Sequence, residues 1–425
     1  MQKSKISPNL PIDQTSERQN LSDTLAGLLA VLLAKMISVW YFSSRNISKG
    51  FPFDSFLFNT FDRFTDYLIP YIVSGYPNIY SPPVGATLPA PPYGHIQFAL
   101  LKYLPFHDNH WVIYGNFLLV ITFFVSVLYN IFRFAYPQQT SESRLHFLIL
   151  LVVAYPLHFI IDRGNLDIYG ALAIALLFST VIRRQHFSDP QVALLLAFLV
   201  SLKPSFGLFA VPMLLGVKLR WAIPASLLVL FNYLVPSIFY GQPINAMWET
   251  ITVSQTFTDG AVLFCHSFQC AHNAMGIKWG TSVSVILLAI FLVGVLCLRF
   301  LMREHERSEI FLMLMTSTIL LTLIFNLQSW DYRLTFLLPI LLARPKIFPA
   351  RYMSRIQSIV LSCSFVVALG YVNILFPNSR AYPTIARCAA LLFIFGLFVY
   401  LQKKKSDIPQ ESQSSDEMQR VENSL

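Results

Sequence analysis

The feature that most constrains this chain is a series of apolar segments separated by short polar stretches in which Lys and Arg collect. Hydrophobic residues make up 55% of the 425 residues and charged residues only 12%. Soluble proteins carry roughly 25% charged residues, so this chain lacks the polar side chains to coat a large water-exposed surface. The pattern predicts an all-α polytopic membrane protein with no soluble domain large enough to act alone.

About 12 segments are candidate membrane spans. The first, residues 25–42, is interpreted as a retained signal anchor because no A-x-A cleavage site follows it. Some of the later segments are shorter than the ~20 residues that a straight span needs, and Pro204, Pro212 and Pro339 predict broken or re-entrant helices there. The later segments fall near 111–134, 145–161, 166–182, 191–203, 205–217, 222–240, 281–301, 309–326, 334–343, 356–375 and 384–401.

We therefore expect one polytopic domain over residues 25–401, with disordered cytoplasmic tails at 1–24 and 402–425. The net charge of +9 comes from small basic clusters between apolar segments, which argues against nucleic-acid binding and follows the positive-inside rule. With a cytoplasmic N-terminus these clusters all fall inside, and so do both termini. The extracytoplasmic face then carries a long first loop (about 43–110), a second long loop (about 241–280) and several short turns.

Three of these outer turns hold polar residues that hydrocarbon penalises by a few kcal/mol or more. They are the segments 162–167, 203–204 and 330–333, which include Arg163, Lys203 and Arg333. Any one of these residues alone could simply cap a helix or extend to the headgroup region. Several of them on one face favour a functional site.

The first outer loop contains two acids, Asp62 and Asp66, four residues apart among aromatic residues. A helix would place both acids on one face, and burial beside aromatic rings makes a carboxylate a better general base. The alternative is a solvated pair on an interfacial helix. The segment 92–106 is too short to span and is expected to be re-entrant or interfacial.

The order of the motifs resembles the C-type glycosyltransferase superfamily, and in particular glycosyltransferase family 87, over about residues 25 to 345. Within the chain, an insertion at Ser81 to Ala90 displaces the Pro-Pro element from the family's position, and Asp62 competes with Asp66 for the acidic position. The matching motifs are Asp66-Tyr67, Asn78-Ile79-Tyr80, Pro91-Pro92-Tyr93, Arg163-Gly164-Asn165, Lys203-Pro204 and Ser329-Trp330-Asp331-Tyr332-Arg333.

This resemblance implies an inverting transfer of a sugar, mannose by preference, from a polyprenyl-phosphate carrier to a lipid- or glycan-linked acceptor at the outer face. Asp66 is then the general base, with Asp62 in reserve. Arg163, Lys203 and Arg333 are then the cations that hold the donor phosphate. The remaining substrate contacts that the resemblance implies are Asn165, Tyr80, Tyr93, Trp330 and Asp331. Apart from the resemblance, His266 or His272 of the second outer loop is a candidate contact of the donor phosphate, and His272 is included among the predicted substrate contacts.

No cofactor or metal is expected. A sugar-nucleotide enzyme commonly holds a divalent metal with an acidic D-x-D motif, and the sequence has no D-x-D. A lipid monophosphate carries less charge than a diphosphate, so fixed cations can stabilise it as it leaves.

The second outer loop holds Cys265, His266, Cys270 and His272. A zinc site would use all four side chains, but their spacing matches no finger pattern. A Cys265–Cys270 disulfide in an oxidising compartment ranks above zinc. The favoured interpretation is a loop in which these residues are incidental.

Three alternative functions stay open. A transporter or lipid flippase also needs broken helices and charges at membrane depth, but it predicts two matching halves, and the halves of this chain do not match. A polysaccharide polymerase is chemically closer and differs in taking a lipid-linked oligosaccharide donor. A non-catalytic scaffold would need no clustered acids and bases.

Overall fold

The computed structural model describes residues 24, 26–30, 32–33, 35–37, 40, 110–140, 144, 151, 154–183, 188–240, 266–276, 281–302, 305–325, 331–376, 379 and 381–406. All regular structure in these ranges is helical. The α-helices (α) and 3-10 helices (η) run in the order α4 (His110–Ala135), α6 (Tyr155–Arg163), α7 (Asp167–Ile182), α8 (Asp189–Leu202), η1 (Pro204–Phe209), α9 (Ala210–Gly216), α10 (Leu219–Tyr240), α12 (Phe268–Ala274), α13 (Thr281–Leu301), α14 (Arg307–Phe325), η4 (Asp331–Phe336), α15 (Leu337–Leu342), α16 (Arg344–Ile347), η5 (Ala350–Tyr352), α17 (Arg355–Leu369), η6 (Val372–Leu375) and α18 (Ala381–Ser406).

Three helices in the described ranges are long and apolar enough to cross a membrane. They are Tyr114–Ala135 within α4, Arg307–Phe325 (α14) and Ala381–Ser406 (α18). Several shorter helices are also apolar, among them Asp167–Ile182 and Asp189–Leu202. The predicted class, a helical membrane protein, agrees with these helices, whereas the number of spans stays a prediction.

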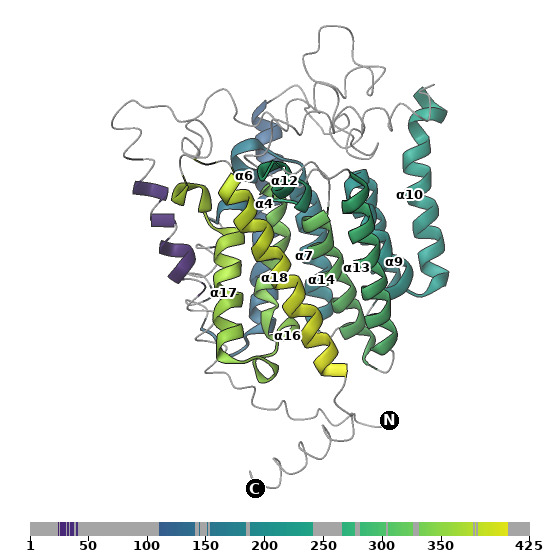
Figure 1. Ribbon diagram of the computed structural model, residues 1–425. Helices are drawn as coiled ribbons and strands as arrows, with labels where there is room; N and C mark the ends of the chain where they lie inside the picture. The colour runs from purple at the N-terminus through teal and green to yellow at the C-terminus, as the bar shows by residue number, and fades with distance from the viewer. Residues whose placement is uncertain are drawn as a thin grey trace.

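The long helices stand roughly side by side in a bundle, with α7 and α14 near its middle and α10 at its edge (Figure 1). Helix α7 packs against α4 and α8, α14 against α13, and α17 against α18. We call the two ends of the bundle the Asp167 end and the Ile182 end, after the first and last residues of α7. The short helices α6 and α12 lie at the Asp167 end (Figure 1).

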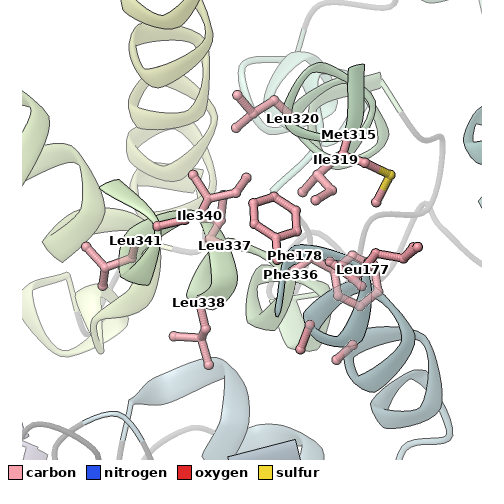
Figure 2. Packing of buried hydrophobic residues seen from close by; sticks show 14 of the residues in the cluster. Leu177, Phe178, Met315, Ile319, Leu320, Phe336, Leu337, Leu338, Ile340 and Leu341 are labelled. Carbon is pink, nitrogen blue, oxygen red and sulfur yellow. The ribbon is translucent and has the colours of Figure 1, made fainter. Parts of the chain in front are cut away.

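The core of the bundle is apolar and forms where α7, α14, η4 and α15 meet. Figure 2 shows Phe178 of α7, Ile319 of α14 and Phe336 of η4 converging there. All three side chains are buried. On the outer helices the apolar side chains instead point outward: Ile290 and Val293 of α13 are 59% and 58% exposed. Apolar surface on both sides of a helix is typical of a bundle surrounded by lipid.

The sequence predicted broken helices at the short apolar segments, and two such breaks are present. Helix α8 ends at Leu202, Lys203 has extended backbone, and the 3-10 helix η1 begins at Pro204. The segment after Asp331 likewise begins as the 3-10 helix η4 and becomes α-helical at Leu337, two residues before Pro339. Both breaks lie at the Asp167 end, where they bring polar side chains into the bundle.

At the Ile182 end, an ion pair ties three helix ends together. The guanidinium of Arg307, at the start of α14, donates two hydrogen bonds to the carboxylate of Asp189, at the start of α8. Arg307 also donates to the carbonyl oxygen of Gly216 at 3.2 Å. The backbone N–H of Lys218 donates to Asp189 Oδ1 at 3.2 Å. These bonds fix the loop between α9 and α10 against α8 and α14.

Gly216 is a site where the packing between α9 and α14 can be tested. A Cβ at this position would lie 2.7 Å from Cδ2 of Phe311. Because that ring is fully buried, we expect Gly216→Ala to destabilise the protein by ~1–3 kcal/mol through overpacking. The measurement is the thermal unfolding midpoint of the purified protein in detergent.

The matched control is Gly294→Ala on α13, where no described atom lies within 4 Å of the added Cβ. This variant should unfold at the wild-type temperature or slightly above it, since Ala favours helix over Gly. Equal midpoints for the two variants would contradict the packing of α9 on α14.

Candidate functional site

The turn between α6 and α7 places the first residue of the candidate site. Gly164 ends α6 in the left-handed conformation (φ 63°), which costs Gly little because it has no Cβ. The side-chain oxygen of Asn165 accepts a hydrogen bond from the backbone N–H of Asp167 at 2.9 Å. The Arg-Gly-Asn sequence therefore builds a tight turn that delivers Asp167 to the start of α7.

The carboxylate of Asp167 is fully buried and binds two cations. Lys203 Nζ lies 2.6 Å from Asp167 Oδ1, and Arg333 Nε lies 2.9 Å from Asp167 Oδ2. Arg333 also donates through Nη2 to Ser205 Oγ at 3.0 Å, and its guanidinium lies over the ring of Phe206 at 5.7 Å. The break after α8 thus presents Lys203 and Ser205 to the same guanidinium–carboxylate pair.

A second buried carboxylate, Asp331, lies two residues before Arg333. Its Oδ2 accepts hydrogen bonds from the hydroxyl of Tyr155 at 2.7 Å and from Nη1 of Arg387. Its Oδ1 lies 3.2 Å from His266 Nδ1. The guanidinium of Arg387 also lies over the Tyr155 ring at 4.5 Å.

We call these side chains together the buried ion cluster. All of them except Ser205 are at most 6% exposed. The 3-10 helix η4 joins the two carboxylates, because it contains Asp331 and also Arg333, which binds Asp167. The members, from five helices and the segments beside them, are Tyr155, Asp167, Lys203, Ser205, His266, Asp331, Arg333 and Arg387.

The protonation states of Asp331 and His266 follow from their surroundings. Burial alone would raise the pKa of Asp331, but the Arg387 guanidinium and the hydrogen bond from His266 outweigh burial and hold the pKa below its usual value. Burial lowers the pKa of His266, although Asp331 acts in the opposite direction. Since an ionised carboxylate can only accept, a neutral His266 donates from Nδ1–H and keeps an acceptor at Nε2.

With His266 neutral, the cluster holds the three cations Lys203, Arg333 and Arg387 against two carboxylates. The described side chains of the cluster therefore carry one excess positive charge in a place shielded from water. Such an arrangement can stabilise an anion more strongly than the same charges would in water. Neither carboxylate suits a general base, because cations already bind both of them.

The structure brings together several residues that the sequence predicted for the site. Lys203 and Arg333 meet on Asp167, and Asn165 and Asp331 lie in or beside the same cluster. Arg163 is the last residue of α6 and is half-buried. The two cations that form ion pairs with Asp167 are Lys203 and Arg333.

The remaining predicted residues are placed elsewhere or not described. His272 is buried in α12, where its Nδ1 lies 3.0 Å from the carbonyl oxygen of Phe268 and its ring packs edge-on to the Phe268 ring. Neither of these contacts is with the buried ion cluster. Five predicted residues lie outside the described ranges: Asp62, Asp66, Tyr80, Tyr93 and Trp330.

Five members of the cluster were not among the site residues predicted from the sequence: Tyr155, Asp167, Ser205, His266 and Arg387. One signal for Arg387 was available, because it is an isolated cation within the apolar segment 384–401 and such residues mark functional or structural partners. Asp167 was flagged as costly at membrane depth but was given no role. Nothing in the local sequence distinguishes Tyr155 from the other 18 tyrosines.

The Cys and His residues of the second predicted outer loop do not form the zinc site that was left open. Cys270 is disulfide-bonded, so its thiolate is not available as a metal ligand, and Cys270 is not incidental as the favoured interpretation held. Cys265, its predicted partner, lies outside the described ranges. Among the residues that the structure describes, no group of three His, Cys, Asp or Glu side chains lies close enough to hold a metal ion.

Comparisons with protein-family models, with curated proteins and with solved structures found no match for this chain.

The ion pairs of the buried ion cluster should contribute to the stability of the folded protein. Asp331→Asn keeps the shape of the side chain but leaves the fully buried Arg387 without its carboxylate, and breaking a buried ion pair costs ~3–5 kcal/mol. We expect a clear drop in the thermal unfolding midpoint of the purified protein.

The control is Glu309→Gln, the same chemical change in the pair with Lys405 at the Ile182 end. Glu309 Oε1 lies 2.8 Å from Lys405 Nζ, and the Glu309 side chain is 42% exposed, so its loss should cost only ~0–1 kcal/mol. If both variants unfold at the same temperature, Asp331 does not hold the cluster together.

Proposed function

We propose that this chain is a membrane glycosyltransferase of the C-type. It moves a sugar, mannose by preference, from a polyprenyl-phosphate carrier to a lipid- or glycan-linked acceptor, with inversion at the sugar. The observation that carries the proposal is the buried ion cluster, in which three cations gather on two carboxylates at one end of a helical membrane bundle.

The cluster supports this chemistry because the leaving group is a phosphate. Negative charge grows on the phosphate oxygen as the bond to the sugar breaks, and cations held in a water-poor place stabilise that charge with little reorganisation. Lys203 and Arg333 are held at 2.6 and 2.9 Å from the Asp167 carboxylate, so both cations are fixed in position before a donor arrives. An Arg can bind two phosphate oxygens at once.

The proposed general base lies outside this cluster. Cations occupy both Asp167 and Asp331, which leaves the predicted first outer loop as the source of a carboxylate that accepts the proton of the acceptor hydroxyl. Asp66 is the proposed base and Asp62 the reserve. No metal is required, because the cations neutralise a monophosphate by themselves.

We further propose a multi-pass protein of the cell membrane, with about 12 spans, both termini in the cytoplasm and the Asp167 end facing outward. The disulfide of Cys270 supports this orientation, since disulfides persist in oxidising compartments. Cys270 lies in α12, at the same end of the bundle as α6 (Figure 1). The Lys residues at 403–405, in the last turn of α18, would then face the cytoplasm.

The test is sugar transfer by the purified protein from a synthetic polyprenyl-phosphate mannose, with and without EDTA, beside a nucleotide-sugar control. We expect transfer from the lipid donor alone and no loss with EDTA. Asp66→Asn should lower the transfer rate by about 10²-fold, and Asp62→Asn should have a milder effect.

Asp108→Asn provides the control, because it removes another acid of the same predicted loop that has no proposed role. Transfer only from the nucleotide sugar, or complete loss with EDTA, would overturn the proposal. Full activity in both Asp66→Asn and Asp62→Asn would remove this loop as the source of the base.

A further inference from the structure

A cavity of about 100 Å³ opens at the Ile182 end of the bundle, the end opposite the buried ion cluster. Protein interiors are close-packed, so a cavity of this size is unusual. One buried water needs a cavity volume of roughly 10–15 Å³. The cavity therefore has room for several waters or a small polar group. Four elements line it: the last residues of α7, the start of α14, α16, and the end of α18.

The inner wall of the cavity is apolar and mostly buried. Met313 of α14, Ile347 of α16 and Phe398 of α18 line it, and each is at most 2% exposed. Val181 and Ile182 close the side formed by α7. A cavity with such a wall favours the apolar part of a ligand.

The mouth of the cavity carries charges of both signs. Glu306 lies just before α14 and Glu309 in its first turn, Lys346 comes from α16, and Lys405 comes from the last turn of α18. Among the described residues that line the cavity, two carboxylates and two ammonium groups balance in charge. Glu309 and Lys405 pair at 2.8 Å, which shows that groups of opposite charge at the mouth lie within hydrogen-bond reach.

The mouth of the cavity lies at the ends of two helices that could cross a membrane. Helices α14 and α18 are two of the three described helices that are long and apolar enough to cross a membrane. Glu309 lies in the first turn of α14 and Lys405 in the last turn of α18. The ends of membrane-crossing helices lie at the depth of the lipid headgroups, so a lipid of the surrounding leaflet can reach the mouth directly.

From these observations we infer that the cavity binds one phospholipid with a zwitterionic, primary-amine headgroup. The ammonium of the headgroup lies against Glu306 and Glu309, and its phosphate lies against Lys346 and Lys405. The methylene groups of the headgroup rest on the apolar wall, and the acyl chains stay in the surrounding leaflet. An anionic headgroup brings no ammonium to Glu306, whereas Glu309 already pairs with Lys405. A quaternary amine cannot donate the hydrogen bonds that carboxylates accept. This site is separate from the proposed transferase site and does not depend on it.

The experiment is native mass spectrometry of the full-length protein released from detergent with phosphatidylethanolamine, phosphatidylcholine or phosphatidylglycerol of the same acyl chains. We expect one phosphatidylethanolamine to be retained at concentrations about tenfold lower than either of the other lipids, since only its headgroup can donate charge-assisted hydrogen bonds to the carboxylates while its phosphate binds the ammonium groups. Equal retention of phosphatidylglycerol would overturn the inference.

Two variants and a control locate the bound lipid. Lys346→Gln and Glu306→Gln each remove one charge from the mouth and should weaken retention of phosphatidylethanolamine about tenfold. Lys403→Gln removes a charge from the same turn of α18 as Lys405, but Lys403 does not line the cavity, so it should retain the lipid as the wild type does. Equal retention by all three variants would place the lipid elsewhere and contradict the inference.

A truncation after Ser406 addresses the other candidate occupant, the acidic segment 407–425. We expect the truncated protein to retain phosphatidylethanolamine as the full chain does. If the lipid is retained only after truncation, the tail occupies the cavity and the inference is wrong.

Discussion

Two carboxylates with no exposure to water, Asp167 and Asp331, decide how one end of this helical bundle is assembled. A charge in such a place is tolerated only when opposite charges and hydrogen bonds surround it. Asp167 therefore requires Lys203 and Arg333, and Asp331 requires Arg387, Tyr155 and His266. These partners come from distant parts of the chain, so satisfying the two carboxylates also fixes the relative positions of α6, α7, α18 and the breaks after α8 and α14.

The 3-10 helix η4 is what allows one short segment to serve both carboxylates. Successive residues of a 3-10 helix are turned by about 120° around its axis, so Asp331 and Arg333 point in different directions although only one residue separates them. Asp331 meets the side of the bundle formed by α6 and α18, and Arg333 meets α7 and η1. A mutation on one side of η4 is therefore expected to affect the other side.

Local sequence signals identified much of the architecture and part of this site. Apolar segments and prolines predicted helices and their breaks, and the cost of charges at membrane depth singled out Lys203 and Arg333. The same signals could not find their common partner, since Asp167 is 36 residues from Lys203 and 166 from Arg333. Tyr155 and Asp331 are 176 residues apart, and no periodic pattern encodes a contact across that distance. Asp331 was predicted to touch the substrate, which stays a prediction, but both of its oxygens are bound by side chains of the protein.

Under the proposed function, the cations of the buried ion cluster stabilise a lipid-linked phosphate. The most direct measurement is the thermal unfolding midpoint of the purified protein with polyprenyl monophosphate and with the uncharged polyprenol of the same length. A ligand that binds only the folded state stabilises that state by ~2.7 kcal/mol when its concentration is 100 times its dissociation constant. We predict a rise in the midpoint with the monophosphate, abolished in Arg333→Ala, and little change with polyprenol. An equal rise with both lipids, or a rise with the monophosphate that Arg333→Ala retains in full, would contradict the claim.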